Sequence, residues 1–147
     1  MNPRERVYVA LGSNLDDREG YLMRAREAIA KLPLSAILAV SSVEETEPAG
    51  GPEGQLRFLN QMVLVETALD PGRFLKLLHR IEDENGRTRE EKWGPRTLDL
   101  DIVRFGTRRL RDPDIRVPHP QLPHRDWWQR EIEELDQLAP VRKDGDA

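Results

Sequence analysis

The spacing of hydrophobic residues changes along the chain between a period of two and a period of three to four. Alternating or continuous apolar positions predict four strands, over Arg6–Leu11, Ala36–Glu44, Phe58–Thr67 and Thr97–Phe105. The second and third strands are separated by a loop rich in proline and glycine, which cannot hold regular structure. The first and third connections are long enough for a helix each.

Both of these connections have helical periodicity, because their apolar residues recur at steps of three and four. In the first, the recurring residues are Leu22, Ala25, Ile29 and Leu32. In the second, they are Phe74, Leu77, Leu78 and Ile81. Asp16 or Asp17 can cap the first helix, and Pro33 ends it. Asp70 and Pro71 give the second helix a cap and a first helical residue.

The order of elements is therefore β-α-β-β-α-β. This order indicates an α+β, ferredoxin-like fold: a four-stranded antiparallel sheet with both helices on one face and the other face left for loops or ligands. After the last strand, Gly106 and Thr107 are expected to turn the chain into a short hairpin with Arg108–Arg111. A chain of 147 residues fits one domain over residues 1–147 with a small C-terminal extension, frayed from about residue 141.

The composition narrows the chemistry that this fold can carry. The chain has no cysteine, so a metal would need oxygen or imidazole ligands, which favours a hard cation such as magnesium. The net charge of -4 argues against nonspecific binding of nucleic acid. Apolar runs are too short to span a bilayer and the N-terminus has no apolar signal core, so we expect a cytoplasmic location.

Asp99 and Asp101 are candidate metal ligands. Strand alternation places both carboxylates on one face, opposite Leu98, Leu100 and Ile102. The two positions are roughly 6.6 Å apart along a strand, which suits one or two divalent ions bound between the carboxylates and a polyphosphate. The residues alone leave open a second interpretation, in which the pair belongs to a solvated strand face.

Positive charge gathers just upstream, in a loop that contains Arg87, Arg89, Lys92 and Arg96. Cations beside an acidic strand could bind phosphate while the acids hold the metal, and phosphoryl-type transfer needs mainly such alignment and charge neutralisation. The alternative is a charged surface loop whose ion pairs contribute little. The sequence contains no P-loop and no protein-kinase signature, so these two routes to nucleotide binding are excluded.

One continuous motif is specific enough to indicate a family. It is Trp93-Gly94-Pro95-Arg96-Thr97-Leu98-Asp99-Leu100-Asp101-Ile102, which resembles the signature of the 6-hydroxymethyl-7,8-dihydropterin pyrophosphokinase family. The resemblance extends from Ala10-Leu11-Gly12-Ser13-Asn14-Leu15 to Val117-Pro118-His119-Pro120, over residues 6–127. It implies the βαββαβ fold and an ATP-dependent diphosphotransferase, which moves the β,γ-diphosphate of ATP onto the pterin hydroxymethyl oxygen, releases AMP and serves tetrahydrofolate biosynthesis.

The resemblance also implies a role for each matching position. Asp99 and Asp101 would bind two magnesium ions, and Arg87 and Arg96 would be catalytic residues acting on the transferring phosphates. Nucleotide contacts are implied for Glu82, Arg89, Lys92, Trp93, Ile102 and His119. Pterin contacts are implied for Thr46, Ala49, Phe58, Asn60, Arg125 and Trp127. The partners would be ATP and 6-hydroxymethyl-7,8-dihydropterin, with no nucleic acid and no membrane.

Some positions depart from the family pattern. Glu47 stands where proline is common, Ala49 where a larger apolar residue is common, and Asp114 where an ATP-contacting basic residue can occur. Either Trp127 or Trp128 could stack on the pterin ring. Without the resemblance, the acidic pair also fits another metal-dependent phosphate or nucleotide-sugar enzyme, and the fold also fits a noncatalytic ligand-binding domain.

Overall fold

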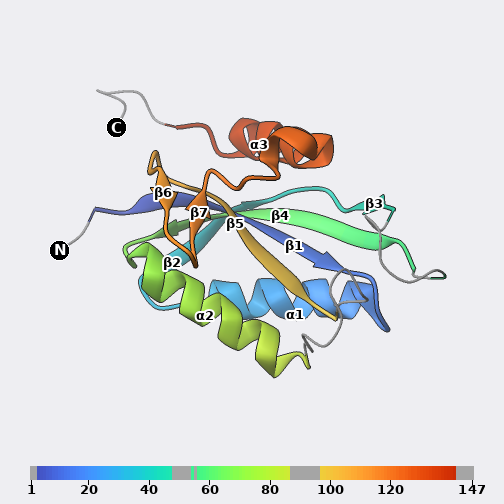
Figure 1. The fold of residues 1–147 in the computed structure, drawn as a ribbon. Coiled ribbons are helices and arrows are strands. Elements are labelled where there is room, and N and C mark those ends of the chain that lie inside the picture. The colour runs from blue at the N-terminus through green and yellow to red at the C-terminus, as the bar shows by residue number, and fades with distance from the viewer. Residues whose placement is uncertain (1–2, 48–53, 55, 87–96, 142–147) are drawn as a thin grey trace.

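A five-stranded antiparallel sheet lies at the centre of the structure, a computed structural model that describes residues 3–47, 54, 56–86 and 97–141 (Figure 1). The strands are β1 (Glu5–Ser13), β2 (Ser35–Val40), β3 (Glu44–Thr46), β4 (Phe58–Thr67) and β5 (Asp99–Phe105). They are ordered β2-β4-β1-β5, with β3 paired to β4. The ferredoxin-like α+β fold predicted from the sequence is confirmed, and β5 is an edge strand of the sheet.

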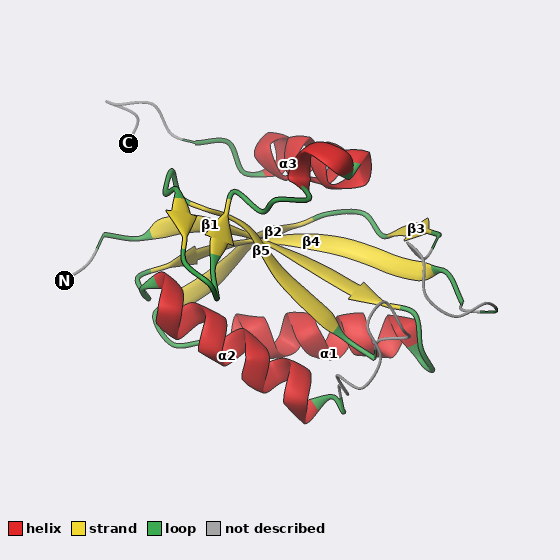
Figure 2. Ribbon diagram, viewed as in Figure 1, coloured by secondary structure: helices red, strands yellow, loops and turns green. Residues whose placement is uncertain are grey.

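Helices α1 (Arg18–Ala30) and α2 (Pro71–Glu84) cover one face of this sheet (Figure 2). Both predicted caps are present. The Asp17 carboxylate accepts a hydrogen bond from Gly20 N at 3.1 Å, and the Asp70 carboxylate accepts one from Arg73 N at 2.9 Å. The core between helices and sheet is hydrophobic, and its fully buried members include Val9, Leu22, Ile29, Val63, Phe74 and Leu78.

A third helix, α3 (Asp126–Leu138), covers part of the opposite face and follows the short 3-10 helix η1 (Leu122–His124) (Figure 1). Trp128, Ile132 and Leu135 recur at steps of four and three, so they form one apolar stripe, and all three are buried. They pack in a second core cluster with Tyr8, Ala10, Met62, Leu64 and Val103 of the sheet. The expectation that this face is left for loops or ligands is therefore wrong where α3 lies.

The predicted strand Ala36–Glu44 is interrupted in the structure and divides into β2 and β3. The cause is a contact that is distant in sequence. Ser42 donates from its backbone N and from its Oγ to the carboxylate of Glu134 in α3, at 3.0 and 2.8 Å, across 92 residues of sequence. Ser41 still donates from its backbone N to Met62 O of β4 at 2.9 Å, so these hydrogen bonds direct the chain toward the helix from Ser42 onward.

The predicted hairpin between β5 and Arg108–Arg111 is also wrong. Gly106 does turn the chain, with a φ of 55°, but the next two strands pair with each other instead of with β5. These strands are β6 (Leu110–Arg111) and β7 (Arg116–Val117). The Arg108 guanidinium binds the Glu5 carboxylate at 2.8 Å, which holds the chain after the turn beside β1.

Two predictions about the chain as a whole are not tested by this architecture. One domain over residues 1–147 stays a prediction, and the frayed tail falls on residues 142–147, which lie outside the described residues. Within the described part of the chain, no helix is long and apolar enough to cross a membrane.

Candidate active site

Three neighbouring strands bring Asn60, Gly12 and Asp99 into one row across the sheet. Gly12 of β1 lies directly opposite Asn60 of β4 on one side and Asp99 of β5 on the other. Side chains directly opposite each other in antiparallel strands point to the same face. This is the α3 face, because Ala10 and Met62, each two residues from a member of the row, pack in the cluster beneath α3. The row joins the predicted pterin contact Asn60 to the predicted metal ligand Asp99.

The alternation predicted for β5 is confirmed. Leu98, Leu100 and Ile102 are buried in the core beneath α1 and α2, and Asp99 and Asp101 are half-buried on the other face. Asp101 lies opposite Ala10, in the row next to that of Gly12 and Asp99. Two carboxylates therefore stand side by side along an edge strand and opposite the smallest side chains of β1.

A cavity of about 430 Å³ opens beside β5. Its size is in the range of cavities that bind small molecules and cofactors. Because β5 is an edge strand, residues from both of its faces reach the cavity. Five of the predicted metal and nucleotide positions line it: Glu82, Asp99, Asp101, Ile102 and His119. Side chains contributed by β5, α2 and the segment after β7 thus meet in one place.

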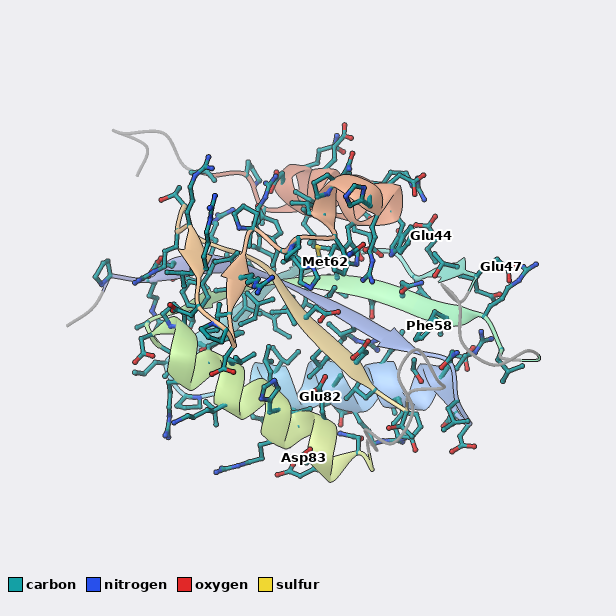
Figure 3. The ribbon with its side chains drawn as sticks, viewed as in Figure 1. Glu44, Glu47, Phe58, Met62, Glu82 and Asp83 are labelled. Atoms are coloured by element: carbon teal, nitrogen blue, oxygen red, sulfur yellow. The ribbon has the colours of Figure 1, made fainter. Side chains whose placement is uncertain are left out.

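Glu82 connects α2 to the backbone of β5. Glu82 is 1% exposed, and its Oε2 accepts a hydrogen bond from Leu100 N at 2.8 Å. Figure 3 shows Glu82 on the α2 side of the sheet, whereas Met62 and Glu44 lie on the α3 side. Leu100 lies between Asp99 and Asp101, so this hydrogen bond fixes the strand that carries the acidic pair.

His119 faces the acidic pair from the segment after β7. Its Nε2 lies 3.9 Å from Asp101 Oδ1, its backbone N donates to Val103 O at 2.9 Å, and its ring packs edge-on against Trp128. Burial, together with the positive charge of Arg125, lowers the pKa of His119 to about 4, although Asp99 acts in the opposite direction. His119 is therefore neutral at pH 7.

The donor set on β5 fits magnesium. Among the described residues, no group of three or more His, Cys, Asp and Glu side chains is arranged to hold a metal ion. Mg²⁺ commonly takes one or two carboxylates and completes its shell with water and substrate phosphates. Asp99 and Asp101 supply hard oxygen donors of this kind at the wall of a cavity.

Asn60 is held by neighbours on β3 and β4. Its Nδ2 donates to Thr46 Oγ1 at 2.7 Å and to Glu44 O at 3.3 Å. This orientation turns the amide oxygen toward β1, where a Cβ built on Gly12 would lie 3.6 Å from Asn60 Oδ1 and 3.6 Å from Phe58 Cδ1. The structure thus brings together three of the predicted pterin contacts, Thr46, Phe58 and Asn60.

The predicted pterin contacts from the C-terminal part of the chain lie at the start of α3. Trp128 is 2% exposed and belongs to the core, whereas Trp127 is half-buried at the border of the same cluster. The Arg125 guanidinium lies 4.4 Å from the Trp128 ring centroid and 5.8 Å from that of Trp127. The indole Nε1 of Trp127 is buried without a hydrogen-bond partner among the described residues. Of these two tryptophans, Trp127 is therefore the one that lies at the border of the core.

Several predicted site residues lie outside the described residues. They are Ala49, which precedes β4 in the sequence, and Arg87, Arg89, Lys92, Trp93 and Arg96, which precede β5.

The sequence also contained a signal that was missed. Leu75 and His79 line the cavity together with Glu82, and the three are spaced at i, i+4 and i+7 along α2. Helical spacing counted back from Glu82 would have placed His79 in the site. Residues 113–116, including Ile115 and Arg116, also line the cavity, and the departure of Asp114 from the family pattern gave no expectation for them.

Fold and site together define a class of protein: a ferredoxin-like α+β protein with paired carboxylates on an edge strand and a small-molecule-sized cavity beside them. A family model described as 7,8-dihydro-6-hydroxymethylpterin-pyrophosphokinase (HPPK) matches residues 8–137. The chain belongs to this family.

Curated relatives agree with this assignment. The chain is 45% identical over 135 residues to the 2-amino-4-hydroxy-6-hydroxymethyldihydropteridine pyrophosphokinase of Bacillus subtilis (strain 168), a match that covers 92% of this chain and 75% of the relative. The proteins of the same name from Pseudomonas aeruginosa and Haemophilus influenzae are 45% identical over 115 residues and 38% identical over 121 residues. These matches cover 78% and 82% of this chain and 70% and 75% of the relatives.

Proposed function

We propose that Asp99 and Asp101 hold the Mg²⁺ that positions ATP for pyrophosphoryl transfer, and that Asn60 holds the acceptor pterin. As a member of its family, the protein is an ATP-dependent pyrophosphokinase, which transfers the pyrophosphoryl group of ATP to a hydroxymethyldihydropterin in folate biosynthesis. In this reaction the hydroxymethyl oxygen forms a bond to the β-phosphorus, the bridging bond between the α- and β-phosphates breaks, and AMP leaves. The proton of the hydroxyl group is lost to solvent.

The row Asn60–Gly12–Asp99 is the observation that supports this arrangement most strongly. Neighbouring strands are about 4.8 Å apart, so the two outer positions of the row are separated by roughly 10 Å. A heterocycle held at Asn60 would therefore direct its hydroxymethyl group toward phosphates held at Asp99. Such alignment of nucleophile and phosphate is the main requirement of phosphoryl-type transfer.

The metal site is proposed to take two Mg²⁺ ions on Asp99 and Asp101. Bound there, Mg²⁺ would neutralise charge on the phosphate oxygens and orient the polyphosphate. The protein's own part is to hold the two carboxylates in place, which the Glu82 hydrogen bond to Leu100 N does from the α2 side. His119, neutral and beside Asp101, is proposed to contact the nucleotide.

The nucleotide side of the site is proposed to extend along the cavity. Glu82 and Ile102 line it together with His119, and the resemblance adds Arg89, Lys92 and Trp93. Arg87 and Arg96 are proposed as the catalytic residues that act on the transferring phosphates, because arginine binds phosphate oxygens through several directed hydrogen bonds.

The pterin side is proposed to lie on the α3 face at the end of β4. Asn60 would pair with the donor and acceptor edge of the heterocycle, and Phe58 would contact its ring. Trp127 is proposed to stack on the ring, since Trp128 is occupied in the core. The remaining proposed contacts are Thr46, Ala49 and Arg125.

Product identity tests the proposal. Purified protein, Mg²⁺, ATP and 6-hydroxymethyl-7,8-dihydropterin are mixed, and the nucleotides are separated over time. AMP that forms only when the pterin is present is the expected result. ADP in place of AMP would contradict diphosphate transfer, and unchanged ATP with a folded protein would contradict catalysis.

A further inference from the structure

Gly12 occupies the middle of the row that joins the two substrate sites. It is buried, and it faces the side of the sheet that carries Asn60 and Asp99. The next residue of β1 on this face is Ala10, opposite Asp101. The strand between the proposed pterin and metal positions therefore presents only a hydrogen atom and a methyl group.

The fold itself does not require glycine at this position. Among the described glycines, the left-handed ones are Gly54, Gly86 and Gly106, so Gly12 has a backbone conformation open to any residue. A Cβ on Gly12 would meet its nearest neighbours, Asn60 Oδ1 and Phe58 Cδ1, at 3.6 Å, an ordinary van der Waals distance. A methyl group would therefore fit the protein as it stands.

Other glycines of this chain show what a structural requirement looks like. A Cβ on Gly20 would lie 2.1 Å from Asp17 Oδ2, and one on Gly106 would lie 2.6 Å from Glu5 Oε2. At Gly20 a side chain would displace the Asp17 carboxylate that caps α1, and at Gly106 the positive φ of 55° also disfavours any other residue. Gly12 has no such collision, although glycine weakens a strand because it packs poorly and loses more backbone freedom on folding.

We propose that Gly12 is a specificity-determining residue for the pterin, because its missing side chain leaves room for the hydroxymethyl end of the substrate between Asn60 and Asp99. The inference rests on the proposed function. A glycine inside a strand often marks a close approach of a ligand to the backbone. The methyl group of an alanine would point at the two side chains, Asn60 and Phe58, that are proposed to hold the heterocycle. It would occupy space needed by the pterin while leaving the cavity beside β5 unchanged.

The test compares Gly12→Ala and Gly12→Val with wild-type protein. Dihydropterin binding is measured by titration calorimetry in the presence of Mg²⁺ and α,β-methylene ATP, whose bridging bond cannot be cleaved in the reaction. Binding of the same ATP analogue with Mg²⁺ is measured separately, and thermal unfolding is followed for each variant. Gly72→Ala is the matched control, because Gly72 is exposed on α2 and a Cβ there would be 3.4 Å from Asp70 Oδ1.

The Gly12→Ala protein is expected to unfold at the wild-type temperature or slightly above it. Its Kd for the pterin should rise by about tenfold or more, and further for Gly12→Val, while its Kd for the ATP analogue stays within about twofold. Unchanged pterin binding would overturn the inference. A lowered unfolding temperature with equal loss of both ligands would also overturn it, because glycine would then be needed by the fold. Wild-type protein that makes no pterin-dependent AMP would instead contradict the proposed function.

Discussion

His119 Nε2 lies 3.9 Å from Asp101 Oδ1, at the wall of the cavity beside β5. The other ring nitrogen, Nδ1, accepts a hydrogen bond from Gln121 N at 3.0 Å. A nitrogen that accepts carries no proton, so the neutral imidazole holds its proton on Nε2, the atom nearer to Asp101. The Asp101 carboxylate thus faces a neutral N–H group and not an imidazolium.

Removal of the Glu82 side chain should destabilise the protein at β5. In Glu82→Ala, Leu100 N loses its acceptor in a buried position, which should lower the free energy of unfolding by about 1–3 kcal/mol. Glu82→Gln keeps an acceptor oxygen and should lose less. Urea unfolding of both variants measures the difference, with the exposed Glu84→Ala as control. A Glu82→Ala protein as stable as the control would show that this hydrogen bond does not hold the strand.

The two neighbouring tryptophans should respond differently to substitution. Trp128→Ala removes a buried core side chain and should cost about 3–5 kcal/mol of stability. Trp127→Ala should cost less, and it should raise the Kd for the pterin about two- to tenfold through the loss of ring stacking. Denaturant unfolding and pterin titration separate the two effects. Pterin titration is made under conditions in which both variants are folded. The assignment of Trp127 to the pterin is wrong if Trp128→Ala weakens pterin binding and Trp127→Ala does not.

Glu131 should make the protein less stable as the pH rises. This residue of α3 is 3% exposed, and both of its carboxyl oxygens are buried without a hydrogen-bond partner among the described residues. Burial, with smaller contributions from Glu44 and Glu134 and against the attraction of Arg130, raises the pKa of Glu131 to about 8. The folded protein therefore keeps a proton that the unfolded chain releases above its ordinary pKa of 4.5.

The sign of the effect follows from this proton. Stability is greatest below the unfolded pKa and decreases as pH rises through the folded value of about 8, with a slope of at most about 1.4 kcal/mol per pH unit. Glu131→Gln cannot ionise and should flatten this dependence. Urea unfolding between pH 5 and 9 compares it with Glu133→Gln, whose site is exposed. Equal pH slopes for wild type and Glu131→Gln would refute a buried neutral carboxyl.

The fold could be predicted where periodicity decides the structure. The two helices, their Asp17 and Asp70 caps and the strand Phe58–Thr67 follow from local patterns, and the structure contains each of them. The break between β2 and β3 could not be predicted, because it depends on hydrogen bonds between Ser42 and Glu134, which are far apart in sequence. Local spacing carries no information about such a contact.

The site was predictable to the extent that it lies on a strand. Alternation alone placed Asp99 and Asp101 on one face, and this placement is confirmed. The pairing register, which puts Gly12 between Asn60 and Asp99, arises only when three strands assemble, so local spacing does not show the place of Gly12 in this row. His79 was missed for a different reason: an exposed histidine on a helix has no distinguishing feature of its own, and only its spacing from Glu82 indicates that it faces the site.

The central claim is that the carboxylates of β5 hold the metal on which transfer depends, and metal binding tests it most directly. Mn²⁺ is used in place of Mg²⁺, and its binding in the presence of ATP is measured by electron paramagnetic resonance. The variants are Asp99→Asn, Asp101→Asn and, as control, Asp112→Asn, whose site is exposed. AMP formation and thermal unfolding are measured on the same samples. Both β5 variants should stay folded, bind Mn²⁺ more weakly and lose on the order of 100-fold or more in turnover, whereas the control should match wild type. Wild-type Mn²⁺ binding and metal-dependent turnover in either β5 variant would contradict the account.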